Sequence, residues 1–128
     1  HYWKEGIKEW DGFKIQNLVF FDRMVDDLGF LPETLFSIAG FINTIGHPFI
    51  KEGVEWISKI ISENNKLTAS QLPTNTEYYL EEIVLSFSSE YEEEARKVDH
   101  FRNHLLRILN FLVSRGSTVG FLIREELF

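Results

Sequence analysis

The sequence predicts an all-α fold of six or seven helices in stacked antiparallel hairpins, solenoid-like or arranged as an irregular bundle, with no sheet. Three observations carry this prediction. Apolar residues recur at three- and four-residue steps along most of the chain, which is the period of an amphipathic helix. Proline and glycine stand where helices typically begin and end. One run near the C-terminus has an apolar surface too wide for a surface helix.

That run, residues 89–116, is predicted to form one long helix. Ser88 or Ser89 would cap its start, and Gly116 would end it. Its apolar residues recur at helical spacing: Val98, Phe101, Leu105, Ile108, Leu109 and Leu112. We therefore expect the segment 98–112 to be shielded from water by several partner helices at once.

The elements before the long helix follow in order. A short helix is expected over residues 2–11, and a firmer one over 13–28, with Gly29 as its stop. Pro32 opens a third helix that closes before Gly46, and Pro48 opens a fourth that runs to Ile61. Because only Gly46 and His47 separate the third and fourth helices, the two should form a hairpin.

A polar loop is predicted over residues 63–75, with Leu67 and Leu72 turned back onto the core. A fifth helix starts at residues 74–76, and its apolar face consists of Leu80, Ile83, Val84 and Phe87. A last helix is expected over 119–127, capped by Ser117 or Thr118. In that helix Leu122 and Ile123 should point inward.

Composition narrows the class of protein. The 128 residues fit a single helical domain over 1–128, and 44% hydrophobic content with twelve Phe indicates a folded core. The net charge of −7 opposes binding to phosphate backbones, so nucleic acid is a poor partner, and no apolar run is long enough to span a membrane. With no Cys, a reducing, cytoplasmic location is expected. The chain begins His-Tyr-Trp-Lys without Met, so we expect a fragment of a larger protein.

Two blocks, 31–65 and 74–116, each pair two helices over a length near that of helical repeats. With PETL at 32–35 opening one helix and VEWISKII at 54–61 closing its partner, the arrangement resembles a HEAT- or armadillo-like α-solenoid segment. The closing run NFLVSRGS, followed by Arg124-Glu125-Glu126, resembles the end of the helical C-terminal region of large bacterial multidomain ATPases of the defence type. These resemblances imply a scaffold or sensor surface attached to other domains of a bacterial parent chain.

His100 and His104 are four residues apart, a spacing that lets two imidazoles share a metal ion. No Cys is available as a ligand, and the Glu that a zinc-protease motif would place after the first His is replaced by Phe101. We therefore expect these histidines to be boundary side chains, and no metal site and no cofactor are predicted.

Charge is strongly segregated near the C-terminal third. Residues 77–94 contain seven acids and no base, whereas residues 96–115 contain five bases and one acid. Helix dipoles and the i,i+4 pairs of Glu92 with Arg96 and of Glu93 with Lys97 account for much of this pattern. Glu55 with Lys59 is another expected i,i+4 pair. The alternative is a basic strip that contacts an acidic partner, formed by Arg96, Lys97, Arg102, Arg107 and Arg115.

No phosphate-binding glycine loop, nucleophile elbow or zinc-protease motif occurs, so no catalytic residues and no enzymatic activity are predicted. The predicted function is a non-catalytic helical scaffold or protein–protein interaction domain. Its partner would be another domain of the parent chain or another protein. The candidate contact residues are aromatic or basic: Tyr2, Trp3, Trp10, Arg96, Lys97 and Arg102. The alternative function is a helical module that contacts nucleic acid through the Arg96–Arg115 strip.

Overall fold

The computed structural model describes residues 18–64, 67 and 71–128, and every regular element in these ranges is helical. The all-α prediction is therefore confirmed for the described residues. Residues 18–28 are helical. The elements after them are α2 (Pro32–Ile42), the short 3₁₀ helix η1 (His47–Phe49), α3 (Ile50–Glu63), α4 (Thr76–Glu90), α5 (Glu92–Lys97), α6 (Asp99–Ser114) and α7 (Thr118–Leu127). The helix expected over 2–11 lies outside the described residues.

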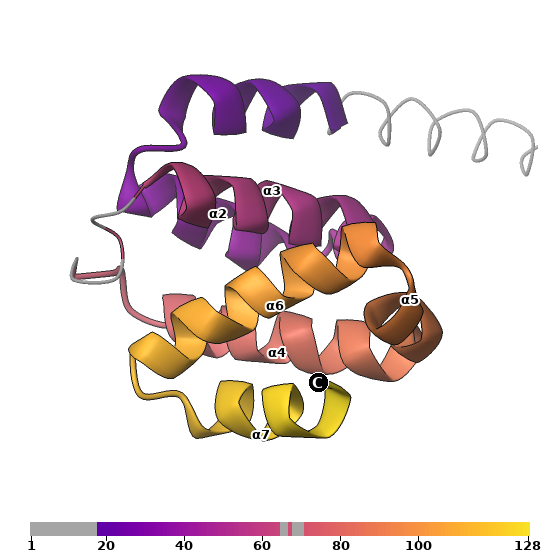
Figure 1. Cartoon of the computed structure of the whole chain (residues 1–128). Coiled ribbons are helices and arrows are strands. Elements are labelled where there is room, and N and C mark those ends of the chain that lie inside the picture. Colours follow the sequence, from indigo (N-terminus) through magenta and orange to yellow (C-terminus); the bar gives the residue numbers. More distant parts are fainter. Residues whose placement is uncertain (1–17, 65–66, 68–70) are drawn as a thin grey trace, which may run out of the picture.

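The helices run back and forth and stack in layers (Figure 1). α3 returns beside α2, and α6 returns across α4 in the layer below. Residues 18–28 lie on the far side of the α2–α3 pair, and α7 packs under α4 and α6. The predicted hairpin of α2 and α3 is confirmed, although Pro48 lies in η1 and the turn 43–46 precedes it.

Helix ends follow local chemistry. Pro32 stands in the first turn of α2, where its missing N–H leaves no hydrogen bond unmade. The Ser117 hydroxyl accepts a hydrogen bond from the Gly120 backbone N–H at 3.0 Å and caps α7, as predicted. Gly116 has a φ of +87°, a left-handed conformation that glycine adopts readily, and it ends the run after α6.

The core is centred on α6, which packs against α3, α4, α5 and α7. Four of its side chains are fully buried, namely Leu105, Ile108, Leu109 and Leu112. Full burial of such a side chain contributes about 1.5–3 kcal/mol. Leu67 is also buried and Leu72 packs on the core, which confirms the expectation for these two residues. The prediction that the long C-terminal run has neighbours on several sides holds from Leu105 onward.

The prediction of one helix over 89–116 is wrong. The hydroxyls of Ser88 and Ser89 donate to the Leu85 carbonyl and so lie at the end of α4, where they compete with backbone hydrogen bonding instead of capping a start. The chain then breaks at Tyr91 and again at Val98, which has an extended backbone and is 43% exposed. The acid-to-base switch over 92–97 belongs to the short helix α5, because its first turn is acidic and its last turn is basic.

One inward assignment on the last helix is also wrong. Ile123 is buried as predicted, but Leu122 is 59% exposed. The side of α7 that packs on α6 is set by Gly120, where an added Cβ would lie 2.8 Å from the Cβ of Leu112. That close approach turns Leu122 away from the core.

None of the helices in the described ranges combines the length and the apolar character that crossing a bilayer requires.

Candidate functional site

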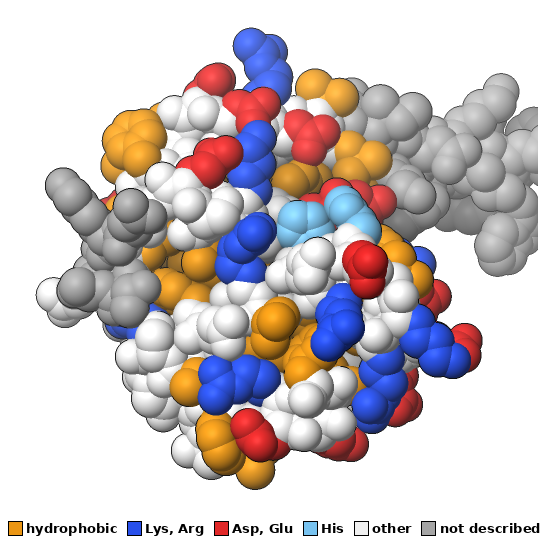
Figure 2. All heavy atoms as spheres, viewed as in Figure 1, with side chains coloured by type: hydrophobic (Ala, Val, Ile, Leu, Met, Phe, Trp, Pro, Cys, Tyr) orange, Lys and Arg blue, Asp and Glu red, His pale blue; other side chains and the backbone are white. Residues whose placement is uncertain are grey.

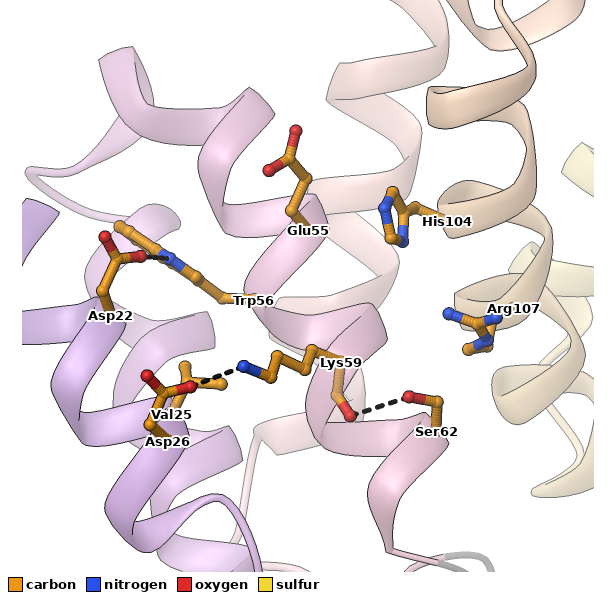
Figure 3. Close-up of a pocket in the computed structure, with 9 residues that line it drawn as sticks. All are labelled: Asp22, Val25, Asp26, Glu55, Trp56, Lys59, Ser62, His104 and Arg107. Carbon is orange, nitrogen blue, oxygen red and sulfur yellow. Dashed lines mark hydrogen bonds and ion pairs between the residues drawn. The ribbon is translucent and has the colours of Figure 1, made fainter.

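A polar groove of about 550 Å³ crosses α3 between residues 18–28 and α6 (Figure 3). Its lining side chains come from all three elements: Asp22, Val25, Asp26, Glu55, Trp56, Lys59, Ser62, His104 and Arg107. Titratable groups dominate this lining, and Figure 2 shows the histidines of this face next to acidic side chains. Catalytic and ligand-binding groups of proteins typically lie in concave surfaces lined by titratable side chains.

On one side of α3, two carboxylates tie residues 18–28 to the bundle. The indole Nε1 of Trp56 donates to Asp22 at 2.6 Å, and the Lys59 ammonium donates to Asp26 at 2.5 Å. The bond to Asp26 raises the pKa of Lys59. The expected Glu55–Lys59 pair within α3 is therefore wrong, because each residue has a partner on another helix.

On the other side of α3, Ser58 joins α3 to α6. Its side chain is fully buried, and its Oγ lies 2.7 Å from Nδ1 of His104 and accepts from the Arg107 guanidinium at 2.8 Å. Burial lowers the pKa of His104, and nearby His100 and Arg107 lower it further against the opposing charge of Glu55. A neutral imidazole can accept at Nδ1, so the Ser58 hydroxyl donates to His104.

The two histidines are brought together, as their spacing predicts. The rings of His100 and His104 lie 4.7 Å apart and nearly perpendicular, and His100 Nε2 lies 2.7 Å from Glu55. Among the described residues, no group of three His, Cys, Asp or Glu side chains is placed to hold a metal ion. The imidazole nitrogens that face the protein are instead used in hydrogen bonds that fasten α6 to α3.

A serine next to a histidine can act as a nucleophile when its oxygen is accessible to a substrate. The Ser58 side chain is buried between α3 and α6, and its oxygen is already bonded to both His104 and Arg107. The chemistry that this arrangement supports is therefore hydrogen bonding between helices.

The lowered pKa of His104 gives a testable pH dependence. The unfolded chain, with a histidine pKa near its ordinary value of about 6.5, takes up a proton before the folded chain does. The free energy of unfolding should therefore fall as pH drops below about 6.5. Urea denaturation between pH 5 and 8 should show a shallower fall for His104→Gln than for the wild-type chain. Equal slopes for the two proteins would contradict this assignment.

The predicted contact residues do not form one continuous strip on a single helix. Tyr2, Trp3 and Trp10 lie outside the described residues. Arg96 and Lys97 lie on α5 and pair with Glu92 at 3.1 Å and Glu93 at 3.3 Å. Both i,i+4 pairs were expected from the sequence.

The other basic residues of the predicted strip are held by contacts within the chain. Arg102 lies over the ring of Phe128 at 5.3 Å, Arg107 donates to Ser58, and Arg115 is bonded to Glu77 and to the Leu67 carbonyl. Figure 2 shows the Lys and Arg side chains of this face interrupted by apolar and neutral surface. Phosphate groups would have to compete with these partners.

A second surface was missed by reasoning from sequence. We define the α4–α7 face by four exposed apolar side chains, Tyr78 and Leu85 on α4 and Val119 and Leu122 on α7. A hollow of about 150 Å³ separates the two helices beside this face. Its lining includes Leu85, Ser89 and Glu92 on one side and Ile123 and Glu126 on the other. The signal in the sequence was Gly120, which marks the side of α7 that approaches α6 and so places Leu122 outside.

Comparison with known proteins gives no family: no family model matches the chain, and no curated protein matches it significantly.

Proposed function

We propose that this chain is a non-catalytic helical scaffold domain that binds a protein partner through the α4–α7 face. The observation that carries the proposal is the exposure of Leu85, Leu122 and Tyr78, whose exposed fractions are 46%, 59% and 55%. The partner would be another protein or another domain of the parent chain. The resemblance to helical-repeat proteins points in the same direction.

The arrangement of α7 supports this proposal. α7 packs on α4 and α6 with Gly120, Ile123 and Leu127, while Leu122 projects away from that side. The outer side of a surface helix is ordinarily polar, and apolar side chains grouped on it typically mark a protein interface. Leu85 on α4 is exposed as well, and it lines a hollow whose other side is formed by Ile123 and Glu126 of α7, so exposed apolar side chains stand on both helices.

The polar groove over α3 fits a structural role better than a ligand site. Asp22, Asp26, Glu55 and Ser58 each bond to a side chain of a different helix. A ligand that used these groups would have to break contacts that hold the helices together. We infer that the groove stiffens the scaffold on which the α4–α7 face is displayed.

The nucleic-acid alternative is less well supported. α4 carries four glutamates and no Lys or Arg. The basic residues of the predicted strip already have partners on α4, α5, α3 or the C-terminus. A chain of net charge −7 that bound phosphate only through such residues would do so weakly and with steep salt dependence.

Site-specific photo-cross-linking tests the proposal. A benzoylphenylalanine placed at Leu122, in the chain expressed in its source cells, should give a discrete cross-linked protein adduct. The same probe at Glu33, an exposed position on α2, should not give that adduct. Failure to form an adduct from position 122, or an identical set of adducts from both positions, would reject the α4–α7 face as the binding surface.

A further inference from the structure

We infer that the α4–α7 face binds a basic amphipathic helix of a partner protein, with the apolar side of that helix on Leu85 and Leu122 and its Lys or Arg side chains on the surrounding glutamates. This inference rests on the proposed function and specifies the chemistry of the partner. Helices that lay an apolar side into a groove between two helices are a recurring mode of recognition.

Glutamates lie next to both exposed leucines on their own helices. Leu85 is preceded at three and four residues by Glu82 and Glu81, and Leu122 is followed at three and four residues by Glu125 and Glu126. Residues three and four apart lie side by side on a helix surface. Each of the two apolar side chains is therefore flanked by two carboxylates on its own helix.

The glutamates of α4 and α7 are only weakly compensated by positive charge. α4 carries four glutamates and no Lys or Arg, and α7 carries two glutamates and one basic residue, Arg124. Arg124 points toward α6, where it donates to Asn110 at 3.0 Å. Across the described residues, Glu82, Glu125 and Glu126 have no salt-bridge partner within 4.0 Å. Glu81 has none either, but its carboxylate accepts a hydrogen bond from the Ser117 hydroxyl at 2.6 Å.

Two neighbouring carboxylates are less available. Glu92, at the end of the hollow, pairs with Arg96, and Glu77 pairs with Arg115. Arg96 also donates to the backbone carbonyl of Glu126 at 3.4 Å, but it forms no ion pair with the Glu126 carboxylate within 4.0 Å. The carboxylates left for the cationic side chains of a partner are therefore chiefly Glu82, Glu125 and Glu126, because Glu81 is already bonded to Ser117.

The spacing of the apolar side chains favours a helical partner. Tyr78 and Leu85 are seven residues apart on α4, a separation of about 10 Å at 1.5 Å per residue. An incoming helix presents its own apolar anchors at the same separation. Beside Leu85, the hollow between α4 and α7 offers a recess of about 150 Å³ for an anchor side chain.

A second copy of this chain is a poorer occupant. Two α4–α7 faces brought together would place Glu81, Glu82, Glu125 and Glu126 of each copy against the same residues of the other, and like charges at close range oppose association. A basic helix replaces that repulsion with attraction.

The test uses an 18-residue model helix of leucine and lysine with its leucines on one side, labelled with fluorescein, and the full 128-residue chain. Fluorescence anisotropy at 50 mM salt should show binding that weakens at least tenfold in the Leu85→Ser/Leu122→Ser variant. Glu82→Gln/Glu126→Gln should weaken binding about threefold at 50 mM salt and have little effect at 500 mM, since salt screens exposed charges. Ile45→Ser, which alters an apolar side chain 67% exposed in the turn after α2, should leave binding unchanged.

Three results would overturn the inference. One is equal binding by the Leu85→Ser/Leu122→Ser variant and the wild-type chain, with helix content confirmed by circular dichroism. Another is equal binding of a leucine and glutamate peptide of the same pattern. The third is a concentration-dependent dimer in sedimentation velocity that Leu122→Ser abolishes, which would assign the face to self-association. If the peptide fails while the cross-link from position 122 persists, the interaction function stands and only the basic-helix partner is rejected.

Discussion

Replacing Phe87 by alanine should lower the free energy of unfolding by about 3–5 kcal/mol, the range for removal of a buried aromatic side chain. Phe87 is fully buried on α4, and its ring lies 5.4 Å from that of Tyr91 and 5.7 Å from that of Phe101. The ring therefore joins α4 to the break at Tyr91 and to the first turns of α6. Urea denaturation followed by circular dichroism measures the loss.

Leu85→Ala on the same helix is the matched control. Leu85 is 46% exposed, so its truncation should change the free energy of unfolding by no more than about 0.5 kcal/mol. Similar losses for the two variants would mean that α4 does not present its Phe87 side to the core.

The second large effect is expected at Gly53 on α3. A Cβ at this position would lie 2.7 Å from Cγ1 and 2.8 Å from Cδ1 of Ile42, a fully buried residue at the end of α2. Because Ile42 is fully buried, its side chain cannot turn out into solvent to relieve the clash, so Gly53→Val should lower the free energy of unfolding by about 2–3 kcal/mol through overpacking. Thermal or urea unfolding of the variant checks the value.

Gly40→Ala is the control, because this substitution should raise the free energy of unfolding instead of lowering it. A Cβ at Gly40, in the middle of α2, would meet the ring of Tyr79 at an ordinary contact distance of 3.5 Å. Because alanine favours a helix over glycine, this variant should gain about 0.5–1 kcal/mol. If Gly53→Val and Gly40→Ala had the same free energy of unfolding, that result would contradict the close packing of α2 on α3.

Much of the fold could be predicted because its signals are local. Pro32, Gly29 and Ser117 fix helix ends through the chemistry of their own backbone and side chains, and the structure places helix ends beside all three. The apolar face of α4 follows from three- and four-residue spacing alone. Leu80, Ile83, Val84 and Phe87 are all buried.

The failures arise where periodicity is ambiguous. Apolar spacing continues through Tyr91 and Val98, so a pattern of buried positions could not reveal that the backbone leaves the helix at both. The six-residue helix α5 has its own acidic first turn and basic last turn, and that complete dipole pattern was the clue to a separate element. On α7, the spacing allowed Leu122 inside or outside, and packing at Gly120 decided it.

The sites depended on tertiary contacts that spacing does not encode. Lys59 had an apparent partner in Glu55 one turn away, yet its bond is to Asp26, 33 residues distant. Ser58 gave no sequence signal, although its buried hydroxyl joins His104 and Arg107. The pairing of His100 with His104 was visible because both lie on one helix.

The central claim is that this chain meets its partner on the α4–α7 face and not in the polar groove over α3. The most direct measurement compares photo-cross-linking from Leu122, on that face, with cross-linking from Ser62, an exposed residue that lines the groove. We predict a discrete protein adduct from position 122 that is absent from position 62. An adduct from position 62 with none from position 122 would contradict the claim and would indicate the polar groove as the contact surface.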